Sequence, residues 1–229
     1  MIGLTAPART RSDDARGTDR GPLVALGSFL ALFALSVAVP SLAGAGTMPP
    51  PGSSTADFRQ WADHHIAVIS SGALMVAAAA ALTGAGVYLA RRLAVVAPSA
   101  CGPRLVRISS AAAATTLAAC GVCVGVLGAR STSLSADTME TLGRAAFALG
   151  GPVHTLLLGG VVLGWALVLD RAGTGRRAAI VLGTLAGLDL IGAAALFSDE
   201  LIVLVPIGRF PTMLGLVVGS VRWLPRRES

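Results

Sequence analysis

Two residues of opposite charge, Asp189 and Arg209, stand inside otherwise apolar stretches near the end of the chain. They lie ten residues before and ten residues after Asp199, which belongs to the polar turn Ser-Asp-Glu at 198–200. At about 1.5 Å per helical residue, both charges fall about 15 Å from that turn, near the middle of a bilayer. A lone charge at that depth costs about 2.5–3.5 kcal/mol on insertion scales. We therefore predict that Asp189 and Arg209 pair between two antiparallel helices, as a structural clamp or as the wall of a polar pocket.

His154 lies at a similar predicted depth in an earlier apolar stretch and joins the same intramembrane polar cluster. Pro152 precedes it closely, and Pro206 and Pro211 flank Arg209. A proline inside a helix leaves the carbonyl four residues back without its usual donor. Irregular backbone at membrane depth is tolerated where it is packed in protein or lines a cavity. The pattern suggests a mid-membrane polar cavity, with a plain hydrogen bond from His154 to a neighbouring helix as the alternative.

Cys120 and Cys123 form a Cys-x-x-Cys motif inside an apolar stretch and share one face of a helix. In a soluble chain this motif would indicate metal or redox chemistry, but with His154 it gives only an incomplete zinc-ligand set. Small thiols also pack well in an alanine-rich helix. We therefore predict packing and no cofactor, and keep a weak metal or redox site of Cys120, Cys123 and His154 as the alternative. Cys101 is predicted to be a free thiol in a cytoplasmic loop.

Asp63, His64 and His65 stand together at the start of another apolar stretch and form a candidate site at the outer mouth of its helix. Adjacent histidines point in different directions on a helix, so they are poor metal co-ligands. Histidine changes charge near neutral pH, so this group could sense pH. Solvation at the membrane interface is the simpler prediction for all three.

The elements that must hold these residues are membrane-spanning helices. The chain is 54% apolar and 13% charged, with a mean hydropathy of +0.74, whereas soluble domains carry about 25% charged residues. Apolar runs of about 20 residues are long enough to cross the hydrocarbon core. We predict an all-α, polytopic membrane protein, a bundle of six transmembrane helices near residues 22–43, 66–90, 105–128, 145–169, 178–197 and 201–221.

The arginines predict how these helices are oriented. Fourteen lie in the tail before the first run, in alternate connections and after the last run; the other connections hold Arg59, Arg130 and Arg144. Positive loops face the cytoplasm, so both termini are predicted to be cytoplasmic. The pI near 10.8 then reflects loops facing anionic lipid, and no nucleic-acid partner is predicted. Cleavage of the first run as a signal peptide is the rival, although that run is longer than a signal core.

Residues 1–20 are predicted to be a disordered tail, 21–224 the transmembrane domain and 225–229 a second cytoplasmic tail. In the first outer loop, Ser53 or Ser54 could cap a short helix whose Phe58 and Trp61 lie at the membrane surface.

Further along the chain, Asp137 and Glu140 have capping-box spacing, so the fourth helix is predicted to begin outside the membrane. Trp165 and Trp223 suit interfacial anchors. GxxxG pairs in four successive runs predict close helix packing.

The whole pattern resembles the small six-helix bacterial membrane proteins that are catalogued only as domains of unknown function. The resemblance covers about residues 20–225. It depends on the extended loop after the first helix, the polar helical segment "LSADTMETLGRAAFALGGPVHTLLLG" and the turn "DRAGTGRR". It carries no functional residues over to this chain, and it implies a bacterial plasma membrane.

Two classes of function are predicted. The first is a non-enzymatic protein: a small-molecule binder, a sensor, a transporter-like protein or a partner subunit. Its partners would be the lipid bilayer and either a second copy or another membrane protein. The alternative is an intramembrane redox or metal-dependent enzyme.

Overall fold

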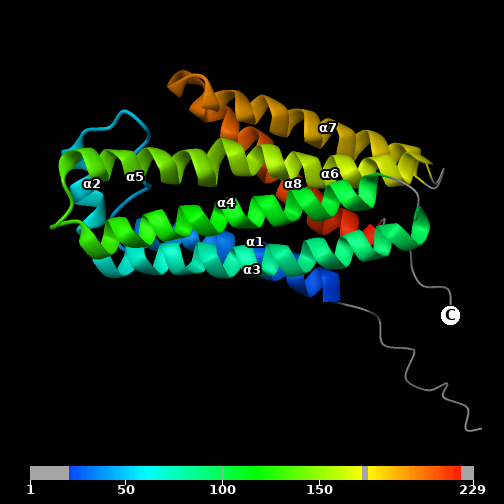
Figure 1. Ribbon diagram of the computed structural model, residues 1–229, viewed down its shortest axis with the longest axis horizontal. Helices are drawn as coiled ribbons and strands as arrows, with labels where there is room; N and C mark the ends of the chain where they lie inside the picture. Colours follow the sequence, from blue (N-terminus) through cyan, green and yellow to red (C-terminus); the bar gives the residue numbers. More distant parts are fainter. Residues whose placement is uncertain (1–20, 99–100, 172–174, 223–229) are drawn as a thin grey trace, which may run out of the picture.

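The computed structural model describes residues 21–98, 101–171 and 175–222, and within these ranges it contains helices and no strand (Figure 1). The predicted tails at 1–20 and 225–229, and Trp223, lie outside the described residues. The helices are α1 Gly21–Leu42, α2 Thr55–Ala62, α3 His65–Val96, α4 Gly102–Arg130, α5 Ala136–Ala148, α6 His154–Arg171, α7 Arg176–Ala193 and α8 Leu204–Arg222. A π-helical turn, Leu149–Val153, joins α5 to α6, and the 3-10 turns Ala194–Leu196 and Asp199–Val203 lead from α7 to α8.

Six helical segments are long and apolar enough to cross a membrane, as the sequence predicts. The all-α, polytopic fold is therefore confirmed. The second and third spans are longer than predicted, because α3 has 32 residues and α4 has 29. At about 1.5 Å per residue, α3 is about 48 Å long, well beyond a hydrocarbon core of about 30 Å. Hydropathy marks where a helix leaves lipid, and not where it ends.

The six spans run along one common direction, so their connections gather at two ends (Figure 1). One end holds the starts of α1, α4 and α7 and the ends of α3, α6 and α8; the other holds α2, the start of α5 and the α7–α8 turn. The described arginines of the first end are Arg91, Arg92, Arg104, Arg107, Arg171, Arg176, Arg177 and Arg222. The second end has only Arg59, Arg130 and Arg144. The charge asymmetry of the sequence therefore corresponds to the two ends of the bundle.

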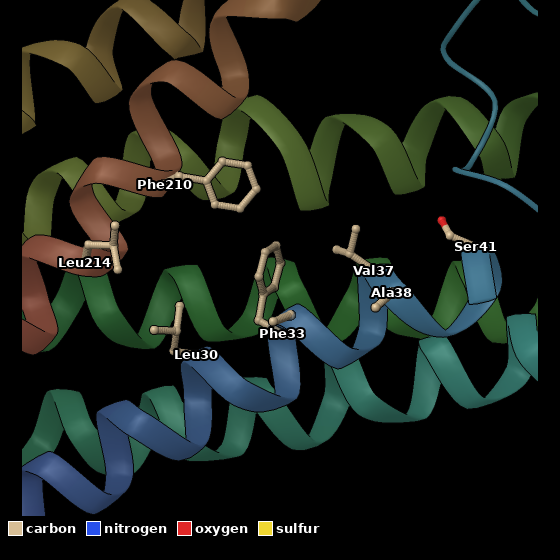
Figure 2. A pocket seen from close by; sticks show the side chains of 8 residues that line it. Leu30, Phe33, Val37, Ala38, Ser41, Phe210 and Leu214 are labelled. Atoms are coloured by element: carbon tan, nitrogen blue, oxygen red, sulfur yellow. The ribbon is translucent and has the colours of Figure 1, made fainter.

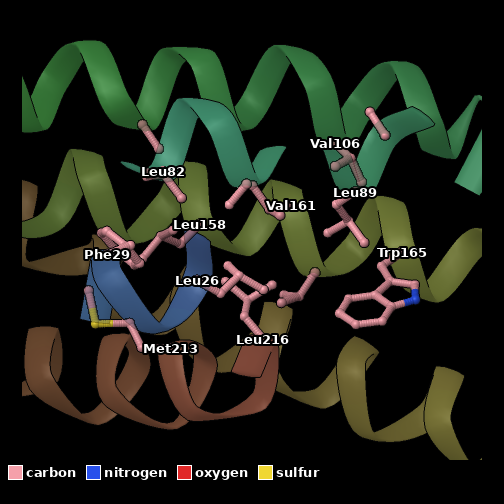
Figure 3. Close-up of a cluster of buried hydrophobic side chains, with 14 of the residues drawn as sticks. Leu26, Phe29, Leu82, Leu89, Val106, Leu158, Val161, Trp165, Met213 and Leu216 are labelled. Carbon is pink, nitrogen blue, oxygen red and sulfur yellow. The ribbon is translucent and has the colours of Figure 1, made fainter. Parts of the chain in front are cut away.

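The main apolar core fills the centre of the bundle and draws on all six spans (Figure 3). Phe29 of α1 and Met213 of α8 meet Leu82 of α3 and Leu158 of α6 in this core. Trp165 is completely buried there, so the prediction that it is an interfacial anchor is wrong. Its ring fills the core between helices, where burying a large apolar side chain contributes about 1.5–3 kcal/mol.

A second, smaller core lies at the end that carries α2 and α5. Ser54 caps α2 through a capping box with Asp57, as one of the two predicted serines. Phe58 and Trp61 are 1% and 4% exposed and pack toward Met139, so the predicted position at the membrane surface is wrong. A Cβ atom at Gly143 would lie 2.5 Å from the Phe58 ring, so the missing side chain makes room for that ring.

The helix predicted from Asp137 begins slightly earlier. Ser135 is the N-cap of α5, and its hydroxyl accepts a hydrogen bond from the backbone N–H of Thr138 at 3.2 Å. Asp137 is therefore in the first turn, where its charge favours the helix N-terminus, and Glu140 instead pairs with Arg144 at 2.6 Å. The predicted capping box at Asp137 is wrong because a serine two residues earlier supplies the cap.

Glycine sets how closely neighbouring helices approach. A Cβ atom at Gly72 of α3 would lie 2.5 Å from the carbonyl oxygen of Gly121 on α4, and one at Gly164 of α6 would lie 2.8 Å from that of Gly102. By contrast, Gly183 and Gly187 of α7 have nothing within 4 Å. The GxxxG pairs of α4 and α6 therefore form tight contacts, while the α7 pair forms none among the described residues.

We expect Gly72→Ala to lower the free energy of unfolding by about 1–3 kcal/mol, because backbone atoms of α4 cannot move aside without separating the helices. Thermal unfolding in detergent micelles measures the change. Gly183→Ala is the matched control, and it should be neutral or slightly stabilising because alanine favours a helix over glycine. Equal loss in both variants would contradict the close α3–α4 contact.

Candidate functional site

The backbone between α5 and α6 departs from a regular helix at mid-membrane depth. Gly151 has φ −97° and ψ −108°, outside helical values, and Pro152 follows it in the π-helical turn. Proline cannot donate the usual helical hydrogen bond, and glycine tolerates the unusual backbone angles. The sequence predicts this irregularity at Pro152. It does not predict that the carbonyls of Gly150 and Gly151 are the ones that turn toward a neighbouring helix.

Arg209 of α8 binds this irregular backbone. Its Nη2 donates hydrogen bonds to the carbonyl oxygens of Gly150 and Gly151, the latter at 2.9 Å, and its Nε donates to the hydroxyl of Thr155 at 3.3 Å. Thr155 in turn donates to the Gly151 carbonyl at 2.9 Å. Only 9% of Arg209 is exposed. The guanidinium thus holds the kink in α5–α6 against α8, which lies far from it in the sequence.

The predicted ion pair between Asp189 and Arg209 does not form. Among the described residues, the oxygens of Asp189 are completely buried and have no hydrogen-bond partner, and no nitrogen of Arg209 lies within the 4.0 Å of an ion pair. The prediction assumed that lipid leaves the arginine no other partner. It fails because the kinked backbone offers carbonyl oxygens, which can satisfy an arginine at membrane depth.

Asp189 nevertheless lies at the level of Arg209, as the spacing from the turn predicts. A Cβ atom at Gly208 would lie 3.0 Å from the Cα atom of Asp189, so α7 and α8 cross at this point. On its other side, a Cβ atom at Gly159 of α6 would lie 2.8 Å from the Asp189 Cβ. The hydroxyl of Thr212 on α8 lies close to the carboxyl group, but it donates to the Leu185 carbonyl at 3.5 Å. Asp189 is therefore enclosed by three helices.

One aromatic ring, which the sequence does not single out, lies against both His154 and Arg209. Its Nδ1 donates to the carbonyl oxygen of Ala113 on α4 at 2.9 Å, which leaves Nε2 buried without a partner. Phe33 of α1 stacks on the His154 ring, with centroids 6.4 Å apart and an angle of 13° between the planes. The Cζ atom of Arg209 lies 5.2 Å from the centroid of the same Phe33 ring. Phe33 therefore connects the histidine and the arginine.

Of the predicted cluster, the structure brings Arg209 and His154 to one level around Phe33, with Asp189 one helix crossing away. Phe33 and Thr155 are missing from the sequence-based prediction. Thr155 directly follows His154 and could have been found from that position. Phe33 carries no such signal, because a phenylalanine in an apolar run is typical of any core helix.

The cysteines do not assemble into a metal site. All three are free, and no group of three or more histidine, cysteine, aspartate or glutamate side chains is arranged to hold a metal ion within the described ranges. Cys120 is buried, and its Sγ atom lies 3.7 Å from the Sδ atom of Met75. A Cβ atom at Gly150 would lie 2.4 Å from Cys120 Sγ. Cys120 thus packs against the kink beside Arg209, while Cys101 is exposed, as expected for a loop thiol.

An apolar groove runs between α1 and α8 next to this cluster (Figure 2). Its volume is about 390 Å³, and Phe33 of α1 and Phe210 of α8 face one another across it. The remaining lining residues are Leu30, Ala34, Val37, Ala38, Ser41 and Leu214. Phe33 therefore has two environments, with one side toward the groove and the other toward His154 and Arg209.

The candidate outer-mouth residues share a shallow depression. Asp63, His64 and His65 line a pocket of about 310 Å³ with Ala43, Ile66 and Ala67. All three are exposed, and Nδ1 of His65 donates to the carbonyl oxygen of Gly128 at 2.7 Å. His65 thus ties α3 to the end of α4. No hydrogen bond joins the three side chains to one another among the described residues.

The fold and this arrangement define a multi-pass membrane protein with a polar cluster buried at mid-membrane beside a groove that opens between two of its helices. Comparisons with protein-family models, with curated proteins and with solved structures found no match to this chain.

We expect Arg209→Met to lower the free energy of unfolding by about 1–3 kcal/mol, because it leaves the buried Gly150 carbonyl oxygen without its donor, whereas the Gly151 carbonyl keeps the Thr155 hydroxyl. Asp189→Asn should cost far less, because it removes a carboxylate that has no partner in this structure. Thermal unfolding of both single variants and the double variant gives the coupling between them.

The coupling should be below about 1 kcal/mol. Removing one partner of a buried ion pair would instead cost about 3–5 kcal/mol at either residue. A double variant that regains most of the stability lost by Arg209→Met would restore the ion-pair model.

Proposed function

We propose that this protein binds a small membrane-soluble molecule in the groove between α1 and α8, beside the buried polar cluster, and that it is not an enzyme. The observation that carries the proposal is the position of Phe33. Its ring lines the groove and also lies 5.2 Å from the Arg209 guanidinium carbon. A single side chain thus separates a lipid-accessible groove from a buried charge.

The dimensions and lining of the groove support this function. Sites for small molecules are typically concave, mostly apolar and about 300–1,000 Å³ in volume, with few polar groups that fix orientation. The groove has about 390 Å³, and Ser41 is the one residue with a polar side chain in its lining. Intramembrane ionisable residues also often mark ligand or ion sites. Arg209 would supply the orienting group.

The alternative, an intramembrane redox or metal-dependent enzyme, finds less support. It needs Cys120, Cys123 and His154 to act on one reacting group. Instead, Cys120 packs against Gly150, and His154 donates to the Ala113 carbonyl. No arrangement of nucleophile, base and orienting group is present among these side chains.

Filling the groove tests the binding function. A photoactivatable hydrocarbon probe, incubated with purified protein in nanodiscs, should crosslink to peptides of α1 and α8 in the unmodified chain. Ala34→Trp should reduce this labelling at least about fivefold, a loss of about 1 kcal/mol, because the indole occupies the groove.

Ala31→Trp is the matched control for that experiment. Ala31 is also an exposed alanine of α1, but it does not line the groove. Labelling lost equally in both variants would point to a general effect on α1, and labelling spread over all lipid-facing helices would contradict a groove site.

We also propose that the protein resides in a bacterial plasma membrane, with the end of the bundle that carries α2 and α5 outside and both termini in the cytoplasm. The arginine asymmetry between the two ends of the bundle supports this orientation. The arginine-only basic composition and the resemblance to small six-helix bacterial membrane proteins support the location.

Thiol labelling in intact cells tests the orientation. A membrane-impermeant maleimide should label Ser53→Cys, which lies in the loop before α2. It should not label Cys101 of the unmodified chain, because that exposed thiol precedes α4 at the cytoplasmic end. Permeabilised cells are the control, in which Cys101 should react. Labelling of Cys101 in sealed cells would reverse the orientation.

A further inference from the structure

Arg209 carries a charge that no side chain in contact with it neutralises. Its hydrogen-bond acceptors are the carbonyl oxygens of Gly150 and Gly151 and the Thr155 hydroxyl, all of them uncharged. Asp189 lies near enough to interact with it electrostatically but makes no ion pair or hydrogen bond with it. A guanidinium stays protonated in proteins, and an anion is attracted far more strongly in a low-dielectric interior than in water. The site is therefore complementary to a negative charge.

One nitrogen of Arg209 remains available to a ligand. Nε and Nη2 make the three hydrogen bonds described above, whereas Nη1 donates to no described residue. Nη1 is not fully enclosed by protein. By contrast, Nε2 of His154 is enclosed and has no hydrogen-bond partner. The exposed 9% of Arg209 is thus consistent with two free N–H groups that an incoming acceptor can reach.

We propose that the ligand of the α1–α8 groove is a single-chain amphiphile with a carboxylate head, which binds Nη1 of Arg209 when the Phe33 ring turns aside. This inference rests on the proposed binding function. The groove of about 390 Å³ with its apolar lining accommodates the hydrocarbon chain. Phe33 and Phe210 face one another across it, so the head reaches the arginine by displacing one aromatic ring and no helix.

The number of free donors favours a carboxylate over a phosphate. A phosphate monoester presents three oxygens and is typically bound by several donors at once. Arg209 has already committed Nε and Nη2 to the backbone and to Thr155. One remaining nitrogen matches the smaller demand of a carboxylate.

Three ligands with the same saturated chain test the proposal in the unmodified protein: hexadecanoic acid, its methyl ester and hexadecyl phosphate. Each competes with the photoactivatable hydrocarbon probe for crosslinking to α1 and α8 in nanodiscs of zwitterionic lipid. The ester keeps the carbonyl acceptor and the chain but has no charge. We expect the acid to displace the probe at a concentration about tenfold or more below that of the ester, as a charge-assisted hydrogen bond would give.

The outcomes separate this inference from the proposed function. Equal displacement by acid and ester would overturn the carboxylate head but keep a groove that binds apolar molecules. Stronger displacement by hexadecyl phosphate would overturn the choice of carboxylate. If none of the three displaces the probe from the groove, both the inference and the proposed function fail.

Variants supply a second measurement. Arg209→Gln should remove the preference for acid over ester while the ester still competes, and a retained preference would overturn the role of Arg209. Phe33→Ala keeps Arg209 and opens its route to the groove, so the ratio of the acid's binding rate to the ester's binding rate should rise. An unchanged ratio would overturn the role of Phe33 as a gate.

Discussion

The contact between the Arg209 guanidinium and the kinked backbone at Gly150 and Gly151 is the interaction on which the centre of this molecule depends. Each side of the contact satisfies a need of the other. The irregular turn before α6 exposes carbonyl oxygens that lipid cannot hydrogen-bond, and α8 carries donors that lipid cannot accept. Their meeting allows a π-helical turn and an arginine to coexist at a depth where either alone would be destabilising.

This contact also explains why the sequence places Asp189, Arg209 and His154 at a similar depth but predicts the wrong partner for Arg209. The depths of Asp189, Arg209 and His154 followed from helical rise and from spacing along the chain, because these are one-dimensional quantities. The choice between a carboxylate and a carbonyl as the partner of Arg209 depends on which face of α8 meets α5–α6, and a single sequence does not contain that information. Pro206 shows the same limit, because it lies in the first turn of α8, and the carbonyl four residues before it, that of Ile202, accepts a hydrogen bond from the Leu204 N–H.

The spans themselves were predictable because hydropathy is a property of single helices. Their outer extensions were not, since α2 and α5 are amphipathic and find their partners only in the folded chain. Phe58 and Trp61 are aromatic residues typical of interfacial anchors, yet both are buried, and Gly143 leaves the space for the Phe58 ring. The same limit applies to Trp165, whose position near the end of an apolar run suggested an interface, whereas its neighbours form a core. Single aromatic residues are therefore weaker indicators of membrane depth than charged residues in loops.

The unequal lengths of the helices have a mechanical consequence for the surrounding lipid. The span of α7 covers 21 residues and that of α3 covers 32, so α7 is just long enough to cross a hydrocarbon core of about 30 Å without tilting. The α7–α8 hairpin should therefore constrain the level of the bilayer relative to the protein, and Phe197 at its turn, 89% exposed, is expected near the headgroup boundary. In a thicker bilayer, hydrophobic mismatch would arise first at α7 and at α1, whose span covers 20 residues, and the lipid beside them would thin while the long helices remain matched. The protein would then favour thin regions of a membrane.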